Sequence, residues 1–310
     1  MKKNDSNIKK AVKYLNNNDC IGLPTETVYG LAANAYSNKA TKKIFSLKKR
    51  PINNPLIVHY YKIEDLKKDC ETNVNFYKLY KAFCPGPITF ILKLKKKSKI
   101  SKNVTNKKNT LAIRFPSHTI ARKLLKSINY PIAAPSANIS ESISPVSKKD
   151  VIDEFGNKIK FVLDGGRSKI GVESTIISLI KTPKILRLGG LSISALEKEL
   201  KMKLRIYLSN NSKIKTPGSS KLHYSPGIPI RMNANMIKKD EAYLLIKKKL
   251  RQNKNYFYLS EKKNLMECCK NLYKTLRKIK KLGYKKIAVE KIPNQGFGLV
   301  INDRLIRASK

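Results

Sequence analysis

The sequence contains no tryptophan, and its five cysteines are scattered along the chain. No two of them have CxxC spacing, and no group of cysteine and histidine has the spacing of a zinc site. An odd, dispersed set of thiols suits a reducing compartment, where cysteines pack as small hydrophobic residues. The composition therefore predicts free structural thiols, and it argues against a disulfide or zinc scaffold.

Several motifs of nucleotide-binding proteins and hydrolases are also missing. The chain has no GxxxxGK[ST] loop, no HExxH and no GxSxG. The segment Gly296-Phe297-Gly298 lacks the third glycine of a dinucleotide-binding fingerprint. If the protein binds a nucleotide, another arrangement of side chains must hold the phosphates.

Long apolar runs are absent as well. No run approaches the roughly 18–20 apolar residues that span a bilayer, and the first residues, MKKNDSNIKK, lack the apolar stretch of a signal peptide. We therefore expect a cytoplasmic protein without a membrane partner. A length of 310 residues with 41% hydrophobic residues suits a globular protein of two domains.

Acidic residues are scarce: 21 aspartates and glutamates face 66 lysines and arginines, which gives a formal net charge of +45. Such a field attracts phosphate-rich partners, and tRNA or double-stranded RNA is the obvious one. However, lysine, asparagine and isoleucine are abundant everywhere, which compositional drift of a whole proteome also explains. No RNA-reading motif decides between the two explanations.

Hydrophobic patterning predicts strands that alternate with helices over the first two hundred residues. An amphipathic helix over residues 8–15, capped by Asp5 or Ser6, begins the series. Residues 95–109 are rich in lysine and asparagine and are typical of a solvated, mobile loop. Further helices are expected over residues 40–47, 75–83, 118–128, 148–155 and 192–200, and strands over residues 20–23, 55–60, 88–94, 111–115, 132–134, 161–163, 174–180 and 185–188. This order predicts an α/β fold with a mixed sheet.

A second unit follows a segment rich in serine, asparagine, glycine and proline. We expect domains over residues 1–208 and 230–310, joined by a linker over residues 209–229. The second domain should be a small α/β unit. Its predicted strands cover residues 242–246, 256–259 and 287–290, and its helices cover residues 265–279 and 302–308.

Polar side chains cluster where predicted strands end, and this is where α/β sheets bind ligands. PTETVYGL at 24–31 follows the first strand, and its hydroxyl groups suit a small polar substrate. Lys48 and Arg50, with Asn54, precede the next strand and could clamp phosphates. When each segment is taken alone, a plain polar turn explains the first and a solvated lysine face explains the second better than a ligand site does.

Two further strands end in the same way. Arg114 closes an apolar strand, where a cation needs an anionic ligand or an internal salt bridge. Ser136 and Asn138 follow another strand among small residues that allow close approach of a ligand. No carboxylate pair suited to hydrolysis stands out. Cations, hydroxyl groups and amides instead suit electrostatic stabilisation of phosphoryl-type chemistry.

These segments occur together and in order, and together they resemble the threonylcarbamoyl-adenylate synthase family, also called the YrdC-like family. The matching motifs are PTETVYGL at 24–31, KKRPINNPLIVH at 48–59, FCPGPITFIL at 83–92, LAIRFP at 111–116, APSANISESISP at 134–145, DGG at 164–166, GVESTI at 171–176 and ILRLGG at 185–190. HYSP at 223–226 is similar to the linker motif of the family's longer members, and residues 259–276 and 296–308 are similar to their C-terminal domain. Cys84, Lys49 and Leu188 depart from the tryptophan, glycine and proline that are common in the family.

The resemblance implies a fold and a set of roles. It implies a twisted, open, mixed YrdC-like sheet with a positively charged concave face, followed by a smaller Rossmann-like α/β domain. The implied catalytic residues are Lys48, Arg50, Ser136 and Asn138. The implied ATP contacts are Arg50, Asn54, Thr110, Ser136, Ser144 and Arg187, with Tyr224 from the linker. The implied threonine contacts are Thr27, His59, Arg114, Ala134 and Ser174, with Arg114 on the amino-acid carboxylate.

The implied activity is that of a nucleotidyltransferase, L-threonylcarbamoyladenylate synthase. It converts L-threonine, bicarbonate or CO2, and ATP with its Mg²⁺ to threonylcarbamoyl-AMP and pyrophosphate, and the protein itself supplies no metal ligand. A downstream tRNA threonylcarbamoyl transferase would use the product to modify the adenosine next to the anticodon. Two alternatives stay open: a non-catalytic protein that binds double-stranded RNA or ribosomes, and a carbamoyl transferase of hydrogenase maturation, which the missing CxxC motifs disfavour.

Overall fold

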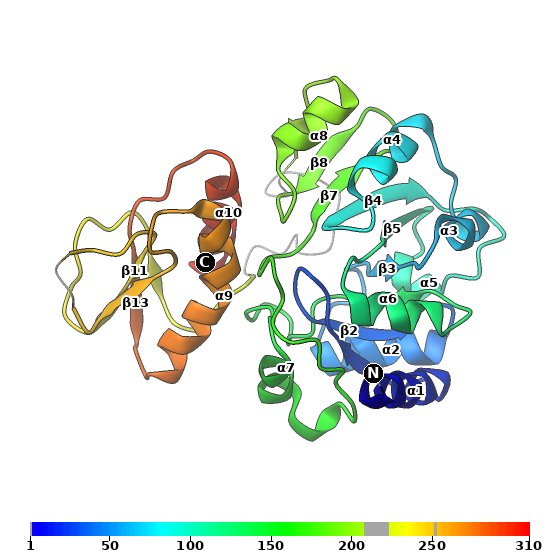
Figure 1. Ribbon diagram of the computed structural model, residues 1–310, viewed down its shortest axis with the longest axis horizontal. Helices are drawn as coiled ribbons and strands as arrows, with labels where there is room; N and C mark the ends of the chain where they lie inside the picture. The colour runs from blue at the N-terminus through cyan, green and yellow to red at the C-terminus, as the bar shows by residue number, and fades with distance from the viewer. Residues whose placement is uncertain (1, 208–222, 251–252) are drawn as a thin grey trace.

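The computed structural model describes residues 2–207, 223–250 and 253–310. It has a larger lobe built on one broad sheet and a smaller lobe built on a second sheet (Figure 1). The helices are α1 (Lys2–Asn16), α2 (Asn38–Lys48), α3 (Ile63–Asp69), α4 (Val74–Phe83), α5 (Lys102–Thr105), α6 (Thr119–Lys126), α7 (Lys148–Phe155), α8 (Ile193–Leu200), α9 (Leu265–Lys281) and α10 (Phe297–Ala308), with the 3-10 turn η1 (Gly156–Lys158).

The strands of the larger lobe form a nine-stranded mixed sheet in the order β1-β2-β6-β3-β5-β4-β7-β8-β9. They are β1 (Ile21–Leu23), β2 (Gly30–Asn34), β3 (Ile57–His59), β4 (Ile88–Lys93), β5 (Thr110–Arg114), β6 (Ile132–Ala133), β7 (Thr175–Ser178), β8 (Lys184–Arg187) and β9 (Arg205–Ile206). Strands β3 and β5 are parallel, and their register pairs His59 with Arg114. Two polar residues therefore leave the sheet side by side, at the carboxyl ends of adjacent strands.

The apolar runs that predicted the strands form the core. Phe90, Ile113 and Ile177 come from β4, β5 and β7, and their side chains are fully buried in one cluster. Burial of one such side chain stabilises the fold by about 1.5–3 kcal/mol. The central strands are thus held rigidly, which fixes the residues that follow them.

The smaller lobe has a four-stranded parallel sheet in the order β10-β13-β11-β12. Its strands are β10 (Ile230–Arg231), β11 (Glu241–Leu245), β12 (Tyr256–Tyr258) and β13 (Lys286–Val289). Asn264 caps α9, and Cys268, Leu272 and Leu276 bury one face of that helix at a spacing of four residues. Helices α9 and α10 lie between this sheet and the larger lobe (Figure 1). The sequence prediction of a mixed α/β fold with a second, smaller α/β unit is confirmed.

The prediction of a solvated, mobile loop over residues 95–109 is wrong in part. Residues 102–105 form α5, which Ser101 caps, and Ile100 and Val104 are buried. These apolar side chains are too few and too widely spaced to give a helical period, so only tertiary packing reveals them. The part of the predicted linker over residues 209–222 lies outside the described residues.

Other differences concern strand and helix limits. Strands β2, β9 and β10 and helix α3 were not expected, because β2 consists of small residues and the other three elements are short. Val162 makes only an isolated bridge to Gly22, where a strand was expected over residues 161–163. Helix α1 begins at Lys2, ahead of the expected caps, and α10 begins at Phe297 rather than 302. In the described part of the chain, no helix is long and apolar enough to cross a membrane.

Candidate active site

A pocket lies where β3 and β5 end and where the chain turns between β1 and β2. About 520 Å³ of space is free of atoms there, including the part open to solvent. The lining includes three arginines, Arg50, Arg114 and Arg187. The lining residues are Thr25, Thr27, Val28, Gly30, Arg50, Ile57, His59, Arg114, Ala134, Pro135, Ser136, Glu173, Ser174, Arg187, His223 and Tyr224.

Hydroxyl groups fix the turn that follows β1. The Thr25 Oγ1 atom donates to the carbonyl oxygen of Val28 at 2.6 Å and lies 2.9 Å from Thr27 Oγ1. Both threonines are buried. The backbone between β1 and β2 is therefore held in one conformation, with the Thr27 side chain at the pocket.

Arg114 reaches this turn from the end of β5. It donates to Thr27 Oγ1 at 2.8 Å and to Glu26 Oε1 at 2.5 Å, and both ionic side chains are buried. The structure thus contains the internal salt bridge that the sequence had left open. Because the Arg114 side chain also lines the pocket, its role toward the carboxylate of a ligand stays a prediction.

Lys48, at the end of α2, lies directly behind the pocket wall. Its ammonium donates to the carbonyl oxygen of Ser136 at 2.6 Å and to that of Asn138. The side chain is only 1% exposed, and burial, aided by the charge of Arg50, holds the pKa of Lys48 well below its usual range. Since an ammonium has three donors, one remains for a further acceptor.

Two arginines carry positive charge into the pocket. Arg50 donates to the side-chain oxygen of Asn54 at 2.6 Å and to the carbonyl oxygen of Pro55 at 2.9 Å. Arg187, at the end of β8, donates to the carbonyl oxygen of Ser174 at 2.9 Å and to its hydroxyl oxygen at 3.1 Å. These acceptors are neutral groups that hold the two guanidinium groups at the pocket. A pocket built in this way favours an anionic ligand.

Two buried histidines also face the pocket. Among the described residues, the Nδ1 atoms of His59 and His223 have no hydrogen-bond partner. Burial lowers the pKa of His59 well below its usual range, and the nearby Arg114 adds to this effect. Burial also lowers the pKa of His223 to about 3. Both rings are therefore neutral at pH 7, and each offers an unused nitrogen to a ligand.

Glu173 and His223 line the pocket although the sequence prediction gave neither a role. Glu173 precedes the predicted threonine contact Ser174, and His223 precedes the predicted nucleotide contact Tyr224. Their motifs were recognised, but only contacts with distant elements show that these two side chains turn inward. Glu173 accepts a hydrogen bond from Ser144 at 2.6 Å, which places Ser144 behind the same wall.

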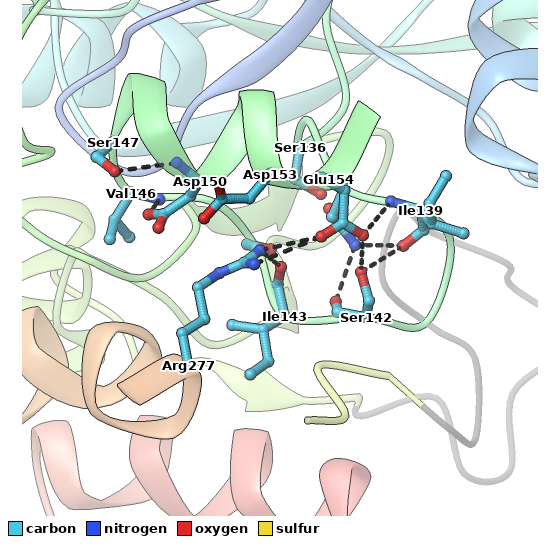
Figure 2. Close-up of polar contacts among 12 residues, drawn as sticks. Ser136, Ile139, Ser142, Ile143, Val146, Ser147, Asp150, Asp153, Glu154 and Arg277 are labelled. Carbon is cyan, nitrogen blue, oxygen red and sulfur yellow. Dashed lines mark hydrogen bonds and ion pairs between the residues drawn. The ribbon is translucent and has the colours of Figure 1, made fainter. Parts of the chain in front are cut away.

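A second carboxylate supports the loop that carries Asn138. Glu154 of α7 accepts hydrogen bonds from the amide of Ile139 at 2.8 Å and from the hydroxyl of Ser142, and it pairs with Arg277 of α9 at 3.4 Å (Figure 2). Arg277 also donates to the carbonyl oxygen of Ile143. The smaller lobe thus helps to hold the loop after Ser136.

Most of the predicted site residues meet at this one place. Those that line the pocket are Thr27, Arg50, His59, Arg114, Ala134, Ser136, Ser174, Arg187 and Tyr224. Lys48, Asn54, Asn138 and Ser144 lie behind them or alongside them through the contacts given above. Thr110 does not join them, because it begins β5 and Arg114 ends that strand. Its predicted contact with ATP stays a prediction.

The described residues offer no ready metal site. They contain no group of three or more histidine, cysteine, aspartate or glutamate side chains placed to hold an ion. Glu173, which lines the pocket, and Glu26, which is buried beside Arg114, are both paired with arginine.

The two sheets and the arginine-lined pocket define a two-lobed α/β protein with a site for a small anionic ligand. The family described as "Telomere recombination" matches residues 13–189, and the family described as "Threonylcarbamoyl-AMP synthase, C-terminal domain" matches residues 188–310. The chain belongs to the threonylcarbamoyl-AMP synthase family.

Individual relatives agree with this assignment. The chain is 36% identical to the threonylcarbamoyl-AMP synthase of Pyrococcus abyssi, over 97% of this chain and 94% of that protein. It is 34% identical to the enzyme of the same name from Bacillus subtilis, over 99% of this chain and 94% of that one. It superposes on the crystal structure of P. abyssi Sua5 in complex with L-threonine with a TM-score of 0.89, at 34% identity, over 97% and 94% of the two chains.

Proposed function

We propose that this protein is an L-threonylcarbamoyladenylate synthase, which makes threonylcarbamoyl-AMP and pyrophosphate from L-threonine, bicarbonate or CO2, and ATP. The observation that carries the proposal is one pocket in which Arg50 and Arg187 lie with His59 and Arg114. Two relatives that match this chain over 94% of their own length are named threonylcarbamoyl-AMP synthase, which supports the proposal. The catalytic function is favoured over a non-catalytic RNA-binding function.

The pocket suits an amino acid at one end. Thr27, His59, Arg114, Ala134 and Ser174 would contact threonine. Arg114 carries the charge needed for a carboxylate, although it already pairs with Glu26. The free Nδ1 of His59 supplies a hydrogen-bonding atom. A site that bonds the threonine hydroxyl would reject valine, because its buried polar partners would be left unpaired.

The other end suits ATP. The proposed contacts are Arg50, Asn54, Thr110, Ser136, Ser144, Arg187 and Tyr224. Arg50 and Arg187 would bind phosphate oxygens through their planar forks. Mg²⁺ would enter as part of the nucleotide substrate, bound to the phosphates.

The chemistry proceeds by two bond-forming steps. The threonine amine joins CO2 and loses a proton, or joins bicarbonate and loses water, to give a carbamate. A carbamate oxygen then forms a bond to the α-phosphorus, while the bond to the bridging oxygen breaks and pyrophosphate leaves with the electron pair. Lys48 and Arg50 would stabilise the developing charge, and Ser136 and Asn138 would orient the reacting oxygens.

Several predictions from the sequence stay proposals. The product would pass to a tRNA threonylcarbamoyl transferase, for modification of the adenosine next to the anticodon. We also propose that the excess lysines bind tRNA or double-stranded RNA and that the protein is cytoplasmic. The domain limits at residues 208 and 229 likewise stay a proposal.

Pyrophosphate release from ATP tests the function directly. Release that requires both threonine and bicarbonate, and that valine does not support, is the expected result. A well-folded protein that releases no pyrophosphate with all substrates present would overturn the proposal. A titration of tRNA at several salt concentrations would then test the RNA-binding alternative.

A further inference from the structure

One buried carboxylate of the pocket is held by the smaller lobe. Glu173 accepts hydrogen bonds from the Tyr273 hydroxyl of α9, at 3.0 and 3.1 Å, and from Nε of Arg304 of α10, at 2.9 Å. Both donors are buried, and Arg304 is 1% exposed. A wall of the pocket in the larger lobe therefore depends on side chains that lie 100 and 131 positions further along the chain.

Arg304 joins three parts of the site at once. Besides Glu173, it donates to the carbonyl oxygen of Leu188 at 2.7 Å, directly after β8 and Arg187. Its guanidinium also lies 4.7 Å from the ring centre of Tyr224, which lines the pocket. Such a contact between a cation and an aromatic face is attractive, more so when both groups are shielded from water.

The backbone of Tyr224 needs this support. Its φ is 64°, in the left-handed region that costs a residue with a side chain free energy. The ring contacts the Arg304 guanidinium, and the centre of the Tyr273 ring lies 5.8 Å from its own, with the two planes 21° apart. The smaller lobe thus fixes the residue of the HYSP motif that faces the pocket.

The positive charge of Arg304 also affects the protonation of Glu173. Burial raises the pKa of Glu173, but the charges of Arg304 and Arg187 and the Ser144 hydrogen bond outweigh burial and lower it to about 2. Glu173 is therefore a carboxylate at every physiological pH. Arg304 also pairs with its neighbour Asp303 at 2.5 Å. Without Arg304, the Glu173 carboxylate would lose its ion pair at 2.9 Å, and removal of one partner from a buried pair is strongly destabilising.

Backbone packing allows this close approach of the two lobes. Gly171, two residues before Glu173, has φ of 79°, and a Cβ atom there would lie 2.6 Å from the Cα of Lys270 in α9. No other residue type fits at that position without moving the helix. The same motif, GVESTI, thus supplies both the contact with α9 and the carboxylate that Arg304 holds.

We propose that Arg304 is a positioning residue for nucleotide binding. By pairing with Glu173 and donating to the carbonyl oxygen of Leu188, next to Arg187, it holds this wall of the pocket in place, and by packing on Tyr224 it holds that ring at the pocket. This inference rests on the proposed function, because it assigns the ATP end of the site to Arg187 and Tyr224. It makes the smaller lobe part of the nucleotide site.

Direct binding of Mg²⁺-ATP, measured by isothermal titration calorimetry on the full chain, tests the inference apart from turnover. We expect Arg304→Gln to raise the ATP Kd by about tenfold or more, since it leaves a buried charge unpaired. Glu173→Gln in the Arg304→Gln background should recover much of that loss, because it removes the unpaired carboxylate. Lys281→Gln is the matched control: it breaks an exposed ion pair between the lobes, to Asp153, and should leave the Kd unchanged.

The outcomes distinguish a failure of the Arg304 inference from a failure of the proposed function. If Arg304→Gln binds ATP as the Lys281→Gln control does, Arg304 serves only to dock the lobes and the inference fails. If the double variant binds more weakly than Arg304→Gln alone, neutralisation of Glu173 is not its role. Should Arg304→Gln fail to fold, Arg304→Lys keeps the charge without the fork and should give an intermediate Kd. A wild-type chain that does not bind ATP would overturn the proposed function itself.

Discussion

The ammonium of Lys48 lies 2.6 Å from the carbonyl oxygen of Ser136, so a side chain at the end of α2 holds the backbone that follows β6. Lys48→Met should remove this contact with little change in volume. It would leave the buried carbonyl oxygens of Ser136 and Asn138 without their donor, at a cost of about 1–3 kcal/mol in the free energy of unfolding. Pyrophosphate release should fall by roughly 10²–10³, as for loss of one donor to a developing charge.

Lys42→Met is the matched control for this experiment, because Lys42 lies on the same helix and is exposed. Its stability and activity should stay close to those of the wild type. Urea unfolding and initial rates of pyrophosphate release measure the two effects. If Lys48→Met is as active as Lys42→Met, then Lys48 contributes structure and no catalysis.

The buried histidines predict an acid-sensitive fold. Because the pKa of His223 is about 3 in the folded protein, against an ordinary 6.5, the unfolded chain binds a proton that the folded chain does not. This stabilisation is complete above pH 6.5 and is lost as the pH falls below that value. At pH 5 the loss of stability amounts to about 2 kcal/mol, and His59 acts in the same direction.

Urea unfolding of the wild type and of His223→Asn at pH 7, 6 and 5 measures this dependence. We expect a smaller loss of stability on acidification in the variant. Glu173 does not affect stability between pH 7 and pH 5. Its pKa is lowered from 4.5 to about 2, so its contribution to the free energy of unfolding is lost only below about pH 4.5. Equal slopes for the two proteins would show that His223 is protonated in the folded state.

The sequence predicts free, unreactive thiols, and the structure allows a quantitative test. All five cysteines are free, and four of them are buried. Burial raises the pKa of Cys20, Cys84, Cys268 and Cys269 to about 12. Since the thiolate is the reactive form, we expect slow reaction with Ellman's reagent at pH 8 in the native protein, and rapid reaction of all thiols after unfolding.

Cys84 is only partly buried, so it should react first. Cys84→Ser should remove the earliest phase and leave the others unchanged. Rapid labelling of several thiols in the folded protein would contradict the burial on which the prediction depends.

The candidate site was largely predictable because its residues follow strands. His59 and Arg114 end β3 and β5, and a parallel pairing brings them together without any knowledge of the loops. This reasoning does not extend to Thr110, which begins β5 whereas Arg114 ends it. The contact of Thr110 with ATP is implied by its motif alone and stays a prediction.

The roles of the smaller lobe were not predictable for another reason. Glu173 and Arg304 are 131 positions apart, and no local period or motif connects them. Short elements such as α5 were missed because their burial depends on distant packing that no local pattern records. The parts that the sequence predicted are those in which each residue's neighbours along the chain decide its environment.

Glu154 offers the last test, because its neighbour in sequence provides the control. Glu154 accepts from the amide of Ile139 and pairs with the half-buried Arg277, whereas Asp153 makes a more exposed ion pair with Lys281. Glu154→Gln removes the charge that compensates Arg277 and should lower the free energy of unfolding by about 2–3 kcal/mol. Asp153→Asn should cost less than about 1 kcal/mol.

The rate of pyrophosphate release shows whether the loop held by Glu154 contributes to catalysis as well as to stability. Glu154 holds the segment between Asn138 and Ser144, and loosening it should lower the rate of pyrophosphate release at a temperature where the variant is still fully folded. Because Asp153→Asn leaves that segment anchored, its rate should match the wild type. If Glu154→Gln loses stability but keeps its full rate, the loop tolerates movement, and Asn138 must then be held by Lys48 rather than by the carboxylate of α7.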